Sequence, residues 1–287
     1  MRRVLFPLSV ALTPVMTLLA CQQPDGQATA KDGAAETSVR TTASASASSN
    51  AGSDTPEPVP GATANATSIS EKLQGGGFTM EYSWPAAVSA IPALARRLGE
   101  ERDRIAAEEK AEWRDMIVDC PKEAVTCRNR SFGKEWKVVA NLPSYLSLSA
   151  DVSTYRGGAH GNYGMESLVW DKRRGEAVDG IDLFRSPEAL GEAVAARYCK
   201  ALDQKRFGRR GIELPSDDPF SDCPTMDELA VLVGSSNGKT FDRITLYAAP
   251  YVAGSYAEGA YEINLDIDRA VIAAVKPAYR RDFSVRR

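Results

Sequence analysis

The chain has 287 residues, 43% of them hydrophobic and 25% charged, with a formal net charge of −3. Such a composition is typical of globular proteins, and the length allows one or two domains. The slightly acidic balance argues against nucleic acid as a partner, because proteins that bind nucleic acid usually carry a basic surface.

The N-terminus has the features of an export signal. Its first residues are basic, residues 4–20 are largely apolar, and the segment ends in Leu-Leu-Ala followed by Cys21. This end resembles the signal of bacterial lipoproteins, whose cysteine becomes an acylated N-terminus. The resemblance implies that residues 1–20 are removed and that acyl chains such as palmitate on Cys21 anchor an exported protein in a membrane. In a Gram-negative cell, Gln22 after the acylated cysteine suits sorting to the periplasmic face of the outer membrane. The alternative to a lipoprotein is a plain cleaved signal followed by an incidental cysteine.

Residues 21–77 form a low-complexity segment rich in Ala, Ser, Thr and Pro. With so few large apolar side chains it cannot bury a core, so we expect a disordered tether. A flexible coil of this length has an end-to-end distance of about 40 Å, which suffices to hold a domain clear of a membrane surface.

Regular hydrophobic patterning begins at Phe78. Residues 78–84 alternate between apolar and polar and predict a strand with one buried face. Pro92 is placed as the first turn of a long helix that runs to about Met116. The charged run 99–110 is expected to be the solvated face of that helix.

Further strands are expected after the helix, at 136–142, 146–152, 165–170 and 177–184. Ser186 as N-cap and Pro187 as first helical residue then open a second helix, whose apolar residues share one face.

The last part of the chain predicts more strands. The run 229–233 is too short to separate helix from strand, and Asn237-Gly238 predicts a hairpin turn that leads to a strand at 241–249. A strand at 261–265 and a short final helix follow. Strands outnumber helices and are joined by short turns, which predicts an α+β fold with antiparallel sheets covered by helices, in two abutting subdomains.

Four cysteines remain besides Cys21, an even number that points to disulfides in an exported protein. Three pairings are allowed, and proximity in the sequence favours Cys120 with Cys127 and Cys199 with Cys223. A metal site is the alternative. The chain has no Cys-x-x-Cys and a single histidine, so neither a metal nor another cofactor is expected.

The only histidine, His160, lies in the glycine-rich segment 155–162. Glycine permits positive φ, so this segment predicts a fixed turn that presents the imidazole beside Tyr155 and Asn162. An unperturbed pKa of about 6.5 suits a general base or a ligand contact, and the structural alternative is a hydrogen bond that pins the loop. Since no Gly-x-Ser-x-Gly motif or other recognisable catalytic set accompanies it, an enzyme is not expected.

A second segment, 249–259, interleaves aromatic and small residues with one carboxylate. The rings of Tyr251 and Tyr256 can stack on sugar rings, and Glu258 can accept hydrogen bonds from hydroxyl groups. Packing of a strand corner is the structural alternative.

Together, residues 155–162 and the pattern Pro-Tyr-x-x-Gly-x-Tyr-Ala-x-Gly at 250–259 resemble the paired extracytoplasmic modules of the RsiV/PdaC type. The resemblance implies a PdaC-type accessory module at 78–164 and an RsiV-type C-terminal module at 165–287. In that family the modules are exported and associated with the cell wall, and the RsiV version binds lysozyme. The chain departs from the family because no transmembrane helix, sigma-binding region or deacetylase domain is evident, so signalling and deacetylation are not carried over.

The sequence thus predicts a lipid-anchored, non-catalytic envelope protein that binds a cell-wall glycan such as peptidoglycan, or a wall-directed protein such as lysozyme. Candidate ligand-binding residues are Tyr155, His160, Asn162, Tyr251, Tyr256 and Glu258. The competing expectation is an envelope hydrolase acting on peptidoglycan or another glycan, with His160 and a carboxylate such as Glu258 or Asp182. A structural spacer is the third alternative.

Overall fold

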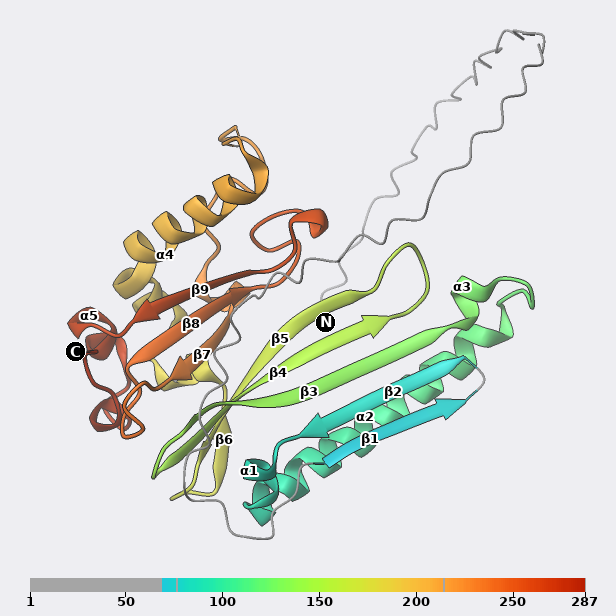
Figure 1. Cartoon of the computed structure of the whole chain (residues 1–287), viewed down its shortest axis with the longest axis horizontal. Helices are drawn as coiled ribbons and strands as arrows, with labels where there is room; N and C mark the ends of the chain where they lie inside the picture. The colour runs from blue at the N-terminus through green and yellow to red at the C-terminus, as the bar shows by residue number, and fades with distance from the viewer. Residues whose placement is uncertain (1–68, 76, 214, 287) are drawn as a thin grey trace, which may run out of the picture. The chain divides into compact units, whose positions relative to one another are not determined.

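The computed structural model describes residues 69–75, 77–213 and 215–286 (Figure 1). The expected signal peptide, Cys21 and the tether as far as residue 68 lie outside the described residues. The end of the expected tether is a strand, β1 (Ile69–Gly75), which pairs antiparallel with β2 along its whole length. Polar residues can form such an edge strand because the hydrogen bonds between strands come from the backbone. The search for alternating apolar side chains therefore does not detect this strand.

The first sheet has six strands in the order of the sequence. After β1 these are β2 (Phe78–Trp84), β3 (Arg130–Asn141), β4 (Tyr145–Tyr155), β5 (Asn162–Asp171) and β6 (Glu176–Val178). Neighbouring strands are antiparallel except β2 and β3, which run parallel. This pair departs from the expected antiparallel pattern. After β2 the chain passes through the short α1 (Ala86–Ser89) and helix α2 (Pro92–Val118), and α2 returns it to the end of the sheet where β2 begins, so that β3 runs in the same direction.

Helix α2 covers one face of this sheet, as Figure 1 shows. Leu94 and Leu98 belong to one buried core there, together with the aromatic side chains of β2 and Leu148 of β4. The charged run of α2, expected to be solvated, is partly turned inward. Glu109 is buried and accepts a hydrogen bond of 2.7 Å from the buried Arg130 of β3. The charge pattern alone did not reveal that the strand below supplies the counter-ion.

The chain then forms a second, three-stranded antiparallel sheet. Its strands are β7 (Ala230–Gly234), β8 (Arg243–Ala248) and β9 (Tyr261–Asp266), packed with helices α4 (Pro187–Arg210) and α5 (Arg269–Ala274). The ambiguous run at 229–233 is therefore a strand. The strand expected at 177–184 is wrong beyond Val178, because a 3-10 turn, η1 (Gly180–Leu183), starts where the Asp179 side chain caps the backbone of Ile181. The remaining short turns are α3 (Val125–Arg128), η2 (Met226–Glu228), η3 (Tyr256–Glu258) and η4 (Arg280–Asp282).

The two hydrophobic cores lie on opposite faces of the six-stranded sheet. In β5, Leu168 belongs to the core under α2, whereas the next residue, Val169, belongs to the core formed with the second sheet and α4. Adjacent residues of a strand point to opposite faces. The α+β prediction is confirmed. The boundary expected between residues 164 and 165 falls inside β5, whose pairing with β4 continues across it.

Both favoured disulfides are present. Cys120 and Cys127 close the segment between α2 and β3, with a Cα separation of 6.0 Å. Cys199 of α4 is bonded to Cys223 in the loop before β7, with a Cα separation of 5.6 Å. In the described part of the chain, no helix is both long enough and apolar enough to cross a membrane.

Candidate functional site

The two loops singled out in the sequence meet in the structure. The imidazole of His160, between β4 and β5, stacks on the ring of Tyr256, between β8 and β9, with centroids 3.8 Å apart and planes inclined by 19°. The Tyr256 hydroxyl donates a hydrogen bond of 2.7 Å to the carbonyl of Gly161. Residues about a hundred positions apart in the chain thus form one surface.

Tyr251 joins this surface from an unusual backbone conformation. Among the described residues it is the only one other than glycine with a positive φ, 72°. Pro250 precedes it, and the amide of Val252 donates a hydrogen bond of 3.1 Å to the carbonyl of Ala249. These are the features of a type II turn, in which Tyr251 occupies the position where Gly usually stands. The side chain is 54% exposed. A strained, exposed aromatic residue is typical of a functional position.

The hydrogen bonds of His160 assign its tautomer. Nδ1 lies 2.9 Å from the carbonyl oxygen of Gly161, which can only accept, so Nδ1 carries the proton. In the neutral ring Nε2 is then an acceptor, and it faces the Tyr251 hydroxyl at 3.4 Å. The ring centroids of Tyr251 and Tyr256 are 5.7 Å apart.

Tyr163 is a fourth member that the sequence analysis missed. Its ring meets Tyr256 edge to face at 6.1 Å, its hydroxyl accepts from the amide of Ala260 at 3.2 Å, and it is 42% exposed. The expected strand began at 165, whereas β5 begins at Asn162. A tyrosine directly after the glycine-rich segment 155–162 was the available signal. We call His160, Tyr163, Tyr251 and Tyr256 the aromatic cluster.

The carboxylate of Glu258 is bound by residues outside the aromatic cluster. One oxygen accepts from the amide and hydroxyl of Ser255, at 3.0 and 3.1 Å, and caps η3. The other accepts from Arg210 Nε at 2.6 Å and from the Tyr261 hydroxyl. Burial alone would raise the pKa of Glu258, but the hydrogen bonds from Tyr261, Arg210 and Ser255 outweigh it and lower that pKa to about 2. The carboxylate is therefore ionised and committed to internal donors.

The other candidate residues are not brought into the cluster. The Tyr155 hydroxyl donates a hydrogen bond of 3.1 Å to the carbonyl of Gly158, within the same loop. Asn162 is exposed and opposes Thr154 in the β4–β5 pairing. Asp182 lies in η1, and within the described residues no hydrogen bond or ion pair joins His160 to Asp182 or to Glu258.

The His160 loop rests on the segment closed by the first disulfide. A Cβ added to Gly157, which has φ 88°, would lie 3.1 Å from the carbonyl oxygen of Thr126 and 3.6 Å from Cys127 Cα. The glycine at this position allows the two backbones to approach closely.

The aromatic cluster offers ring faces, hydroxyl groups and one imidazole without a fixed ionic group. Such a set can stack on a ring or an apolar edge of a ligand and exchange hydrogen bonds with its polar groups. In the part of the chain that the structure describes, no group of three or more His, Cys, Asp or Glu side chains is arranged to hold a metal ion.

Comparisons with known proteins bear on part of the chain. The family model described as deacetylase PdaC matches residues 76–163, a range that ends in the His160 loop and the start of β5 and nearly coincides with the expected module at 78–164. No curated protein matches the chain. The assignment of 165–287 to an RsiV-type module stays a prediction.

Two solved structures of the DUF3298 family are similar to the chain. One, from Pseudomonas aeruginosa PAO1, has 15% sequence identity and a TM-score of 0.45, over 77% of this chain and 98% of that one. The other, from Bacteroides fragilis NCTC 9343, has 14% identity and a TM-score of 0.37, over 70% of this chain and 90% of that one.

Proposed function

We propose that this protein is a lipid-anchored protein of the cell envelope that binds a cell-wall glycan, without catalysing a reaction on it. A location outside the cytoplasm is supported by the match of 76–163 to the PdaC family model, by the lipoprotein-like N-terminus and by two disulfides. A wall-directed protein such as lysozyme is the second ligand to be tested.

The aromatic cluster is the observation that carries the proposal. Its rings are exposed or half-buried, and one of them, Tyr251, is held out by a strained turn. Sugar rings present C–H faces that stack on aromatic side chains, and their hydroxyl groups match the Tyr and His donors and acceptors. Those features favour an uncharged stretch of glycan over an ionic ligand.

The arrangement around His160 supports binding rather than catalysis. A general base needs a proton donor within about 3 Å and a reacting group beside it. Nδ1 of His160 is bonded to a backbone carbonyl, Nε2 faces a tyrosine hydroxyl, and the carboxylate of Glu258 points to Arg210. The competing hydrolase would have to recruit a carboxylate from outside the cluster.

The test is a pull-down with purified peptidoglycan, and separately with lysozyme, in which released sugars and acetate are assayed in the same tubes. The protein should start ahead of Ile69, for instance at Pro56, because a start near Gly75 would delete β1. His160→Ala and Tyr251→Gly remove cluster rings. Phe207→Ala is the matched control, since Phe207 is 55% exposed on α4 and makes no ring contact with the cluster.

Saturable binding to peptidoglycan that both cluster variants weaken and Phe207→Ala retains is the expected result. Binding to lysozyme alone would replace the glycan by a protein ligand. Products that disappear in His160→Ala would overturn the proposal in favour of a hydrolase, and the absence of binding and products would favour a spacer.

A further inference from the structure

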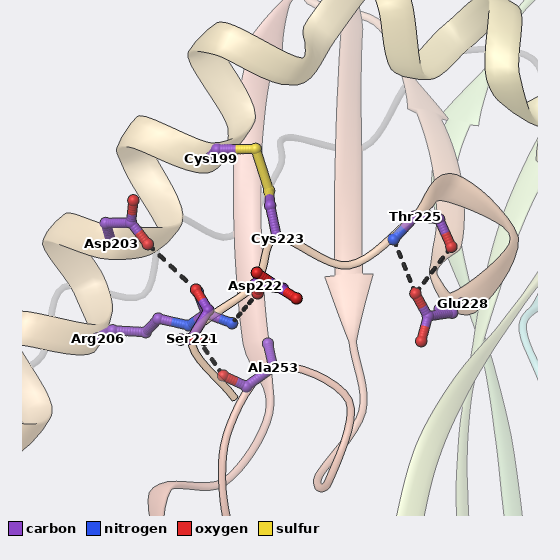
Figure 2. The surroundings of a disulfide bond; sticks show 9 residues. All are labelled: Cys199, Asp203, Arg206, Ser221, Asp222, Cys223, Thr225, Glu228 and Ala253. Carbon is purple, nitrogen blue, oxygen red and sulfur yellow. Dashed lines mark hydrogen bonds and ion pairs between the residues drawn. A yellow bond between two sulfur atoms is a disulfide. The ribbon is translucent and has the colours of Figure 1, made fainter. Parts of the chain in front are cut away.

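Arg206 of α4 is a buried cation that connects three segments of the chain (Figure 2). Its Nε donates a hydrogen bond of 2.9 Å to the carbonyl of Ala253, and its Nη2 donates one of 2.8 Å to the carbonyl of Asp222. Nη1 reaches the carbonyl of Ser221 at 3.3 Å and the carboxylate of Asp203 at 3.2 Å. A buried guanidinium needs such partners, because an unpaired charge away from water is strongly unfavourable.

The bond to Ala253 acts on the turn that holds Tyr251. Ala253 is fully buried, and the carbonyl of the next residue, Gly254, accepts a 3.0 Å hydrogen bond from the amide of Tyr251. Arg206 therefore holds the carbonyl one residue before the one that the Tyr251 amide binds, and so restrains the turn whose positive φ presents the Tyr251 ring.

Two further arginines of α4 hold the rest of the same loop. Arg209 donates to the carbonyls of Glu258 and Ala260, at 2.6 and 2.8 Å. Arg210 donates to the Glu258 carboxylate and, at 3.3 Å, to Ala253. Three side chains on one helix thus bind a loop that has no regular structure apart from η3, and such preorganisation lowers the entropy lost when a ligand is bound.

The second disulfide fixes the other side of the Arg206 contact. Cys223 directly follows Ser221 and Asp222, whose carbonyls Arg206 binds, and its bond to Cys199 ties them to the same helix. Figure 2 shows the disulfide, Arg206 and Ala253 in this arrangement. Without that bond the loop before β7 could withdraw its carbonyls, and the guanidinium would lose two of its acceptors.

We propose that Arg206, supported by the Cys199–Cys223 disulfide, is the positioning residue of the ligand-binding loop 250–259. It sets the orientation of Tyr251 and Tyr256 without contacting the ligand. The inference rests on the proposed function of the aromatic cluster, and it makes the affinity of that site depend on a contact on the opposite side of the loop.

The single histidine of the chain provides a direct probe. The ring current of Tyr256 displaces the imidazole C–H resonances of His160, so a one-dimensional proton NMR spectrum of the protein from Pro56, without a histidine tag, reports whether the cluster is assembled. Arg206→Lys keeps the charge but loses the forked donors. The pair Cys199→Ser with Cys223→Ser removes the disulfide. Arg197→Lys is the matched control, because Arg197 lies on the same helix and bonds to Asp266 and Asp268 instead.

We expect Arg206→Lys and the cysteine pair to move the His160 resonances toward those of an unstacked imidazole, while the methyl resonances of both cores stay in place. Affinity for soluble peptidoglycan fragments should fall about tenfold in both variants and remain unchanged in Arg197→Lys. The cysteine pair carries the test if Arg206→Lys does not fold.

Unchanged His160 resonances and unchanged affinity in folded variants would overturn the positioning role and leave the proposed function standing. If the parent protein binds no fragment while its His160 resonances still respond to Arg206→Lys, the positioning role is supported and the proposed function fails.

Discussion

Tyr251 illustrates how a single residue separates stability from binding. An L-residue in the left-handed region costs about 1–2 kcal/mol relative to an ordinary conformation, whereas glycine adopts it freely but loses about 0.5–1 kcal/mol through the flexibility of the unfolded chain. The ring has few internal contacts, being 54% exposed. The strained backbone and the exposed ring support the place of Tyr251 in the proposed ligand site.

We expect Tyr251→Gly to leave the free energy of unfolding unchanged or to raise it by up to about 1 kcal/mol, while affinity for peptidoglycan falls about tenfold. Urea unfolding and binding measurements on the same preparation check both. Tyr251→Ala is the control, since it loses the ring but keeps the strain and should therefore be less stable than the glycine variant. Equal affinity of the parent and both variants would remove Tyr251 from the site.

Glu258 predicts a pH dependence at the same scale. Its folded pKa, about 2, lies below its ordinary value near 4.5, so the ionised form stabilises the fold above pH 4.5 and that contribution is lost as the pH falls toward 2. We expect Glu258→Gln to destabilise the protein by about 3 kcal/mol at pH 7 and by progressively less between pH 5 and pH 2. Thermal unfolding across that range measures the difference, and a difference independent of pH would show that the charge of Glu258 contributes nothing.

At the scale of elements, the contact between α2 and the sheet is partly ionic. Arg130 donates hydrogen bonds to Glu109 and Glu112 of α2, and Arg156 donates one of 2.8 Å to Glu109. Without Arg130, the buried carboxylate of Glu109 keeps only the exposed Arg156 as a cationic partner, so Arg130→Met should destabilise the protein by about 3 kcal/mol, the lower end for a broken buried pair. Chemical denaturation at neutral pH gives this value.

The double variant Arg130→Met with Glu109→Gln tests the cause of that loss. If the loss comes from the incompletely compensated Glu109 carboxylate, the double variant should be more stable than Arg130→Met alone, because the side chain at position 109 is then neutral. Additive losses would instead show that Arg130 stabilises α2 by packing alone.

Periodicity was sufficient to predict the elements with one buried face. The strand at Phe78, the helix from Pro92 and the helix capped by Ser186 were all identified, since apolar spacing and capping residues act locally. The strand expected at 177–184 was wrong because the cap at Asp179 outweighed a short apolar run. The inward-facing Glu109 was missed because its counter-ion comes from another element.

The candidate site was predictable only in part. Both loops were found from their glycines and aromatic residues, but their contact depends on how the second sheet packs against the first. Glu258 was assigned to the ligand because a lone carboxylate beside tyrosines carries no sign of the arginines on α4 that bind it. Tyr163 was missed because β5 extends further than its hydrophobic pattern.

At the scale of the whole molecule, Gly180 lies where the six-stranded sheet meets β7. A Cβ added there would be 1.8 Å from the carbonyl oxygen of Val231, so the backbones would have to separate. We expect Gly180→Ala to destabilise the protein by about 3 kcal/mol, the upper end for overpacking.

Gly99→Ala is the matched control for this prediction. Gly99 lies within α2 and a Cβ added there has no neighbour within 4 Å, so the same substitution should stabilise the protein by about 0.5–1 kcal/mol. Calorimetric melting temperatures that shift in opposite directions would support the tight contact between the sheets. An unchanged melting temperature in Gly180→Ala would contradict it.

The two disulfides lie behind the two loops of the aromatic cluster, one beneath Gly157 and the other beside Arg206. Disulfides form in oxidising compartments and are kept reduced in the cytosol. A newly made chain on the cytosolic side would therefore possess every residue of the cluster but neither of the closures that support it. On the proposed function, binding of the cell-wall glycan would therefore depend on oxidation of the two cysteine pairs.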